Sequence, residues 1–227
     1  MRHALIGLWM FICSATAAFA QVSIGINVSL FPELVRVPGY PVYYAPQLNS
    51  NFFFYDGMYW VYQDDEWYSS SWYNGPWFRM APQAVPLFVL RLPVRYYRSP
   101  PHYFRNWRAS APPRWGDHWG RDWEHSHRGW DRWDRRSAPP PAPLPRYQRQ
   151  YSGERYPDMN RQQNLHQRNY RYQPRDAATR SQTRERNERH HELQRAPTSP
   201  SSPADRPSRR EQEQTQRIAP AVVAPAP

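Results

Sequence analysis

An aromatic stretch at residues 52–80 constrains the fold of this chain more than any other feature. It reads FFFYDGMYWVYQDDEWYSSSWYNGPWFRM and holds four of the ten tryptophans that follow residue 20. Asp-Gly at positions 56–57 and Asn-Gly at positions 74–75 separate its short aromatic runs, and these dipeptides are the strongest short-range signals of a β-hairpin. The stretch therefore predicts an antiparallel meander, with strands at residues 52–55, 58–62, 66–70 and 76–80.

The aromatic side chains of this meander have two interpretations. Large rings suit the core of a small domain, because each one buries ~150–250 Å². The alternative is an exposed stacking platform for sugar rings or bases. Exposure of these rings in one coplanar row would favour the stacking platform, whereas full burial of the rings would exclude it. The candidate residues of this aromatic binding face are Trp60, Trp67, Trp72 and Trp77.

Further elements are expected on both sides of the meander. Apolar and polar residues alternate over residues 21–30, which predicts a half-buried strand. Residues 42–44 favour another short strand, with an extended edge segment as the alternative. Two prolines bracket residues 86–92, where we expect a short helix across the meander, with an edge strand as the alternative. Residues 94–97 are expected to form a last strand.

A second informative stretch, residues 114–136, reads RWGDHWGRDWEHSHRGWDRWDRR. At 100° per residue its five tryptophans fall within an arc of about 80°, which predicts one amphipathic helix. Three glycines weaken this helix, each by ~1 kcal/mol relative to alanine, so it needs a surface to lie on. That surface is the home domain, a protein partner or a membrane interface. The candidate contact stripe consists of Trp115, Trp119, Trp123, Trp130 and Trp133.

From residue 137 the composition changes to arginine, glutamine, proline and serine. Such a segment buries too little apolar surface to offset its ordering entropy, which predicts a disordered tail over residues 137–227. The tail carries sixteen arginines and nine acidic residues, a net charge of +7, whereas residues 21–104 carry five of each. We therefore expect an anionic envelope polymer or lipid as its partner. Nucleic acid is a less expected partner for an exported chain.

The first twenty residues have the pattern of a signal peptide. A short positive start precedes an apolar run at residues 4–17, and Ala-Phe-Ala at positions 18–20 fits a cleavage site. We expect cleavage after Ala20, a periplasmic or secreted protein, and no membrane span in the mature chain. The alternative is a short N-terminal anchor, although the run is short for a span of ~20 residues. The single cysteine, Cys13, lies in this segment, so packing alone must hold the mature fold.

Recognisable catalytic and cofactor motifs are missing from the sequence. There is no G-x-S-x-G elbow, no phosphate-cradling glycine loop and no paired-cysteine metal knuckle. Asp56 and Asp65 could form a pair for acid–base chemistry, but both fall at expected turns, where aspartate is common. His118, Asp122 and His125 share one face of the expected helix without the spacing of a known metal motif. The sequence predicts no enzyme, no cofactor and no metal site.

Three segments together resemble a known group of proteins. The residues at 52–77, then VPLFVLRLPVRYYR, then APPRWGDHWGRDWE and GWDRWDR, are similar to those of small exported proteins of Gram-negative bacteria that bear W-x-x-G-x-W aromatic repeats. WYNGPW at residues 72–77 fits that repeat, and residues 55–60 form a looser copy. The resemblance covers roughly residues 35–136. It implies residence in the envelope, no established activity and no catalytic residue to carry over.

The expected architecture is mainly β, with four parts along the chain. They are a signal peptide at residues 1–20, a small antiparallel β-domain with a short helix at 21–105, a linker and Trp-rich helix at 106–136, and a disordered tail at 137–227. The expected function is that of a non-enzymatic exported envelope protein with a binding or structural role. The alternatives are a carbohydrate-binding module that uses exposed aromatics and an enzyme of unknown class.

Overall fold

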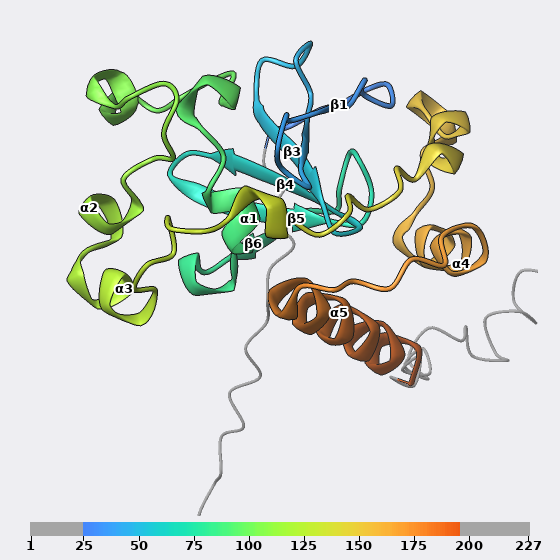
Figure 1. The fold of residues 1–227 in the computed structure, drawn as a ribbon. Helices are drawn as coiled ribbons and strands as arrows, with labels where there is room; N and C mark the ends of the chain where they lie inside the picture. The colour runs from blue at the N-terminus through green and yellow to red at the C-terminus, as the bar shows by residue number, and fades with distance from the viewer. Residues whose placement is uncertain (1–24, 196–227) are drawn as a thin grey trace, which may run out of the picture. The chain divides into compact units, whose positions relative to one another are not determined.

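The computed structural model describes residues 25–195 of the chain (Figure 1). Six strands form one antiparallel sheet, in which each strand pairs with its neighbours in sequence. This sheet confirms the expected meander and the expected strand at residues 42–44. The strands are β1 (Val35–Arg36), β2 (Tyr43–Tyr44), β3 (Asn51–Tyr55), β4 (Met58–Gln63), β5 (Glu66–Ser70) and β6 (Phe78–Met80).

Two tight turns fix the register of the three longest strands. Asp56 and Gly57 join β3 to β4 with φ values of 51° and 89°, and Asp64 and Asp65 join β4 to β5 with φ values of 49° and 66°. Positive φ at both central residues gives the backbone twist that matches neighbouring strands in a hairpin. Glycine adopts this region freely, and aspartate is among the few other residues that tolerate it.

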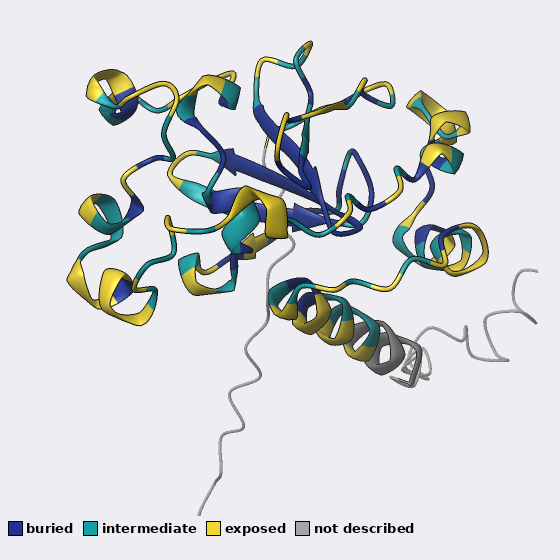
Figure 2. Ribbon diagram, viewed as in Figure 1, coloured by how far each residue is buried: buried dark blue, intermediate teal, exposed yellow. Residues whose placement is uncertain are grey.

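Both faces of the sheet are covered. Along β4, Trp60 and Tyr62 belong to one apolar cluster, which we call the first face, while Tyr59 and Val61 belong to a second cluster, the second face. All four side chains are buried, and Figure 2 shows the central strands in the colour of buried residues. Successive side chains of a strand point to opposite sides, so one aromatic strand supplies both cores.

The segment after β6 covers the first face. The expected short helix is confirmed as α1, and its buried residues are Val89 and Leu90, whereas Leu87 is only partly buried. The expected strand at residues 94–97 is wrong, because the chain after Pro93 folds into a 3₁₀ turn. The helices of this segment are α1 (Leu87–Leu90), α2 (Trp115–Trp119) and α3 (Arg121–Ser126), and its 3₁₀ turns are Pro82–Ala84, Val94–Tyr96, His102–Asn106 and Arg135–Ser137.

The single Trp-striped helix expected over residues 114–136 is wrong. It is divided into α2 and α3 at Gly120, whose φ of 88° and ψ of 177° no helix accommodates. The docking of these tryptophans on the home domain is nevertheless confirmed. Trp115 and Trp123 are buried in the first-face cluster. The remaining three, Trp119, Trp130 and Trp133, are partly buried against the same cluster.

The expected disorder of the tail is also wrong over the described residues 137–195. This segment forms helices, and side chains from its residues 142–172 complete the second face together with residues near the start of the described chain. Residues 196–227 and the expected leader with its expected cleavage site lie outside the described residues. The helical elements are the 3₁₀ turns Arg146–Gln150 and Gly153–Arg155, α4 (Met159–Asn169) and α5 (Ala177–Arg195).

The strand expected over residues 21–30 is not formed in its described part, residues 25–30. Val28 is buried, and its backbone N–H donates to the side-chain oxygen of Asn74 at 2.8 Å. A side chain of the β5–β6 loop therefore takes the place of a strand partner. The described residues up to Arg186 belong to one compact unit, and the end of α5 from Asn187 belongs to a second one. The first unit thus extends about eighty residues beyond the β-domain expected to end at residue 105.

Helices are at least as prominent as strands in the described residues, so the fold is a mixed one and "mainly β" holds only for its antiparallel sheet.

Candidate functional site

The candidate aromatic binding face is not a surface. Trp60, Trp67, Trp72 and Trp77 are 0%, 1%, 0% and 3% exposed. Trp60 and Trp67 pack in the first-face cluster and Trp77 in the second, so they cannot form one coplanar row. The expected stacking platform at these four residues is therefore corrected to core packing.

Residues of the expected tail enclose Trp72. Its ring N–H donates to the backbone oxygen of Gln162 at 3.2 Å. The rings of Tyr147, Tyr151 and Tyr156 approach the Trp72 ring edge-on, with centroids 5.7–5.8 Å away. Composition alone missed these contacts, because tyrosine and glutamine contribute polar atoms as well as buried area.

Two buried glutamines hold the tail segment against the sheet. The Gln148 side chain accepts from the Tyr59 hydroxyl at 3.0 Å and donates to the backbone oxygen of Ser71 at 2.9 Å. The Gln162 side chain donates to the backbone oxygens of Gly75 and Pro157 at 3.2 and 2.9 Å. Each amide meets donors and acceptors that burial would otherwise leave unpaired, and such pairing makes the arrangement specific.

Asp56 anchors the start of α5. Its buried carboxylate accepts hydrogen bonds from the Tyr172 hydroxyl at 2.6 Å and from the backbone N–H groups of Arg175 and Asp176 at 2.8–3.0 Å. Asp65 lies at the other end of β4, so the carboxylate pair considered from sequence is not formed.

The tail segment presents a basic surface. Residues 137–186 contain ten arginines and four acidic residues, a net charge of +6. Because the apolar and amide side chains of this segment face the sheet, the guanidinium groups are left outside. Nine of the ten arginines are exposed and the tenth, Arg186, is half-buried; the nine are Arg146, Arg149, Arg155, Arg161, Arg168, Arg171, Arg175, Arg180 and Arg184.

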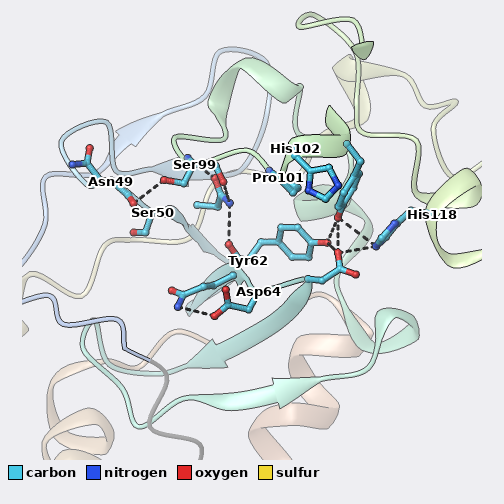
Figure 3. Close-up of a pocket in the computed structure, with 12 residues that line it drawn as sticks. Asn49, Ser50, Tyr62, Asp64, Ser99, Pro101, His102 and His118 are labelled. Carbon is cyan, nitrogen blue, oxygen red and sulfur yellow. Dashed lines mark hydrogen bonds and ion pairs between the residues drawn. The ribbon is translucent and has the colours of Figure 1, made fainter. Parts of the chain in front are cut away.

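A pocket of about 750 Å³ lies beside the β4–β5 turn (Figure 3). Four segments line it: the loop before β3 with Asn49 and Ser50, the turn itself, the 3₁₀ segment around His102, and α2 through His118. The Asn51 side chain links two lining segments of the pocket, because its amide donates to the backbone oxygen of Ser99 at 2.7 Å.

Four polar side chains converge at one end of this pocket. Oδ1 of Asp65 accepts from the hydroxyls of Tyr62 and Tyr103, each at 2.6 Å, and lies 2.9 Å from Nε2 of His118. The two tyrosine oxygens also contact each other, but with both protons directed at Asp65 neither hydroxyl donates to the other. The His118 ring stacks on the Tyr103 ring with centroids 4.4 Å apart. These contacts connect β4, its turn, a 3₁₀ turn and α2.

The environment of this cluster stabilises fixed protonation states. Partial burial raises the pKa of Asp65, but hydrogen bonds from Tyr103 and Tyr62 and the nearby His118 outweigh it, so that pKa is lowered overall. Burial, followed by hydrogen bonding to Asp65, raises the pKa of both Tyr62 and Tyr103. Asp65 is thus an ionised acceptor and both tyrosines are proton donors in hydrogen bonds, which suits binding better than proton transfer.

Sequence reasoning placed Asp65 only at a turn and His118 only on a helix face. His118 meets Asp65, whereas Asp122 and His125 are exposed, so the three helix residues do not gather. Tyr103 was missed altogether. Its only signal was its place in an aromatic, proline-punctuated link, which does not specify a partner.

Within residues 25–195, no helix is both long and apolar enough to cross a bilayer. In the same described residues, no three histidine, cysteine or acidic side chains are grouped to hold a metal ion. Comparisons with protein-family models, with curated proteins and with solved structures gave no match. The resemblance to exported proteins with W-x-x-G-x-W repeats therefore stays a prediction.

Proposed function

We propose that this chain is an exported, non-enzymatic protein of the bacterial envelope that binds anionic envelope material. Its binding surface is the arginine-bearing segment at residues 137–186, and its ligands are the phosphate or carboxylate groups of a polymer or a lipid. The N-terminal pattern of a signal peptide supports the compartment.

The nine exposed arginines are the observation that carries this proposal. Guanidinium groups bind phosphate and carboxylate through two parallel hydrogen bonds, and they remain charged at any physiological pH. Arginines held on a folded segment lose less conformational entropy on binding than those on a free chain. A folded basic surface is therefore a better receptor for a multivalent anion than an unstructured basic tail.

The experiment compares binding of the chain from residue 21 onward to vesicles with and without anionic lipid, and to a soluble acidic polysaccharide. The test variant changes Arg155, Arg168, Arg171 and Arg184 to glutamine. These four are exposed. Each basic residue near an anionic membrane contributes about 1 kcal/mol, so the loss of four should weaken vesicle binding roughly 1,000-fold.

The matched control changes four exposed arginines outside the segment to glutamine: Arg98, Arg105, Arg108 and Arg121. This control removes the same number of positive charges from residues 98–121, which precede the basic segment in the sequence. It should weaken binding far less. Binding should also fall as salt rises, since salt screens exposed charges. Equal losses in both variants, or binding that is insensitive to salt, would refute the proposal. The vesicle and polysaccharide arms decide which source supplies the anionic groups.

A further inference from the structure

The pocket beside the β4–β5 turn is distinct from the basic surface in charge. Its lining includes Asp64 and Asp65 but no arginine, although the chain has thirty arginines. The pocket therefore excludes the anionic ligands that the basic surface attracts. Its volume of about 750 Å³ lies in the range of ordinary small-molecule sites, ~300–1,000 Å³.

The aspartates of the pocket already have hydrogen-bond partners. The Asp65 carboxylate meets two tyrosine hydroxyls and His118, and Asp64 accepts from the amide of Gln63 at 3.1 Å. These partners satisfy acceptor positions of both carboxylates. Among the described residues, the contacts of the Asp65 side chain all use Oδ1, which leaves Oδ2 as an acceptor for a ligand.

The rest of the lining has no acidic side chain and no arginine, and it mixes donors with acceptors. Asn49, Ser50 and Gln63 offer amide and hydroxyl groups, and His102 offers a ring that both donates and accepts. Figure 3 shows Asn49 and Ser50 at the end away from His118, with the Tyr62 ring between them. A ligand with hydroxyl groups along its length matches this lining, because each hydroxyl can both donate and accept.

We propose that this pocket binds an uncharged polyhydroxylated ligand of the size of a mono- or disaccharide. One ligand hydroxyl donates to Oδ2 of Asp65, and others meet the amides and hydroxyl at the opposite end. The site differs from the aromatic platform corrected above, since none of its residues is a tryptophan. It is also independent of the basic surface, so either proposal can fail alone.

The test is saturation-transfer NMR, with titration of each hit, on the chain from residue 21 onward. The probes are glucose, galactose, N-acetylglucosamine and maltose, at about 10 mM to detect millimolar binding. Putrescine is the cationic probe in the same measurement, and calcium, which has no protons to observe, is titrated by calorimetry. We expect saturable binding of at least one sugar and none of either cation.

Two variants assign the binding to the pocket. Asp65→Asn keeps the side-chain shape and tolerates positive φ, and we expect about tenfold weaker sugar binding because the ligand loses a charged acceptor. Asn49→Trp fills the pocket from its exposed rim and should abolish binding; the hydrogen bond at Asn49 uses its backbone oxygen, so the fold is kept. The matched control Asp134→Asn, outside the pocket, should bind like the parent chain.

Sugar binding that survives both variants would overturn the assignment of the site. Binding of putrescine or calcium in place of sugar would overturn the ligand class, and no binding of any sugar probe would overturn the proposal as a whole.

Discussion

The two faces of the sheet are covered by different chemistry. The first face is covered by aliphatic and aromatic side chains, among them the five tryptophans of residues 115–133. The ring N–H groups of Trp60, Trp67 and Trp123 on this face have no hydrogen-bond partner among the described residues, and on the second face the same holds for Trp77. The second face is covered by tyrosines and by the amides of Gln148 and Gln162, which pair with the sheet and its loops. Apolar area thus dominates one cover, while hydrogen bonds specify the other.

This difference explains why hydrophobic periodicity in the sequence predicts the segment that covers the first face but not the segment that covers the second. A stripe of tryptophans is visible in the sequence and indicates a buried face. A segment rich in glutamine, arginine and tyrosine looks like a solvated chain, although its amides and phenols pair inside the fold.

Loss of a buried ring should damage the first face most. Trp115 is fully buried, and its N–H donates to the backbone oxygen of Leu90 at 3.0 Å. We expect Trp115→Ala to lower the free energy of unfolding by ~3–5 kcal/mol, measured by urea denaturation. Trp130→Ala, at a partly buried position, is the control and should cost clearly less. Equal costs would mean that the two tryptophans are packed alike.

Acid should weaken the second face. Burial, assisted by the charge of Arg186, lowers the pKa of His166 from 6.5 to about 4. Between these values the unfolded chain binds a proton that the folded chain does not. The stability present above pH 6.5 is therefore lost as pH falls towards 4, by up to ~3 kcal/mol.

His166→Gln should remove this loss, as measured by denaturation at a series of pH values. The exposed His102 supplies the control, and His102→Gln should keep the parent slope. An unchanged slope in His166→Gln would show that the imidazole is accessible to solvent in the folded chain.

A buried amide should matter more than its polarity suggests. Gln148→Leu keeps the approximate volume but leaves the Tyr59 hydroxyl and the Ser71 carbonyl without their partner. We expect a loss of about 2 kcal/mol, because unpaired buried polar groups cost ~1–3 kcal/mol. Gln150→Leu, at an exposed position, should change the unfolding free energy little. A neutral Gln148→Leu would contradict a cover that depends on hydrogen bonds.

A substitution at the break between α2 and α3 should change the free energy of unfolding least, but the sign of the change is informative. Gly120 has a φ of 88°, which alanine adopts only with strain. Gly120→Ala should therefore destabilise the chain by roughly 1–2 kcal/mol. If the tryptophans instead lay on one continuous helix, the same change would stabilise it by ~1 kcal/mol. Thermal denaturation distinguishes the two signs.

The sequence was informative where local chemistry decides structure. Asp-Gly at positions 56–57 marked a hairpin because its residues accept positive φ, and the aromatic runs marked strands. The short helix at α1 followed from its bracketing prolines. Periodicity failed at Gly120, because a spacing argument treats a glycine as a weak helical residue rather than as a turn.

The candidate site could not be predicted, since it depends on contacts distant in sequence. Tyr62 and Tyr103 meet across 41 positions and Gln148 meets Tyr59 across 89. Such pairings follow from how two covers fold over a sheet and leave no local pattern. The alternating pattern at residues 25–30 predicted a strand that does not form, again because of a contact distant in sequence. The backbone of Val28 pairs with the side chain of Asn74.

Amide hydrogen exchange across α4 tests the central claim most directly. If the arginine-bearing segment is folded on the second face, the backbone N–H groups of residues 163–169 should exchange far more slowly than in an unfolded chain. They should also lose protection when Gln148→Leu or acid weakens that face. Exchange of these amides at the rate of an unfolded chain, beside protected amides in β4, would contradict the account.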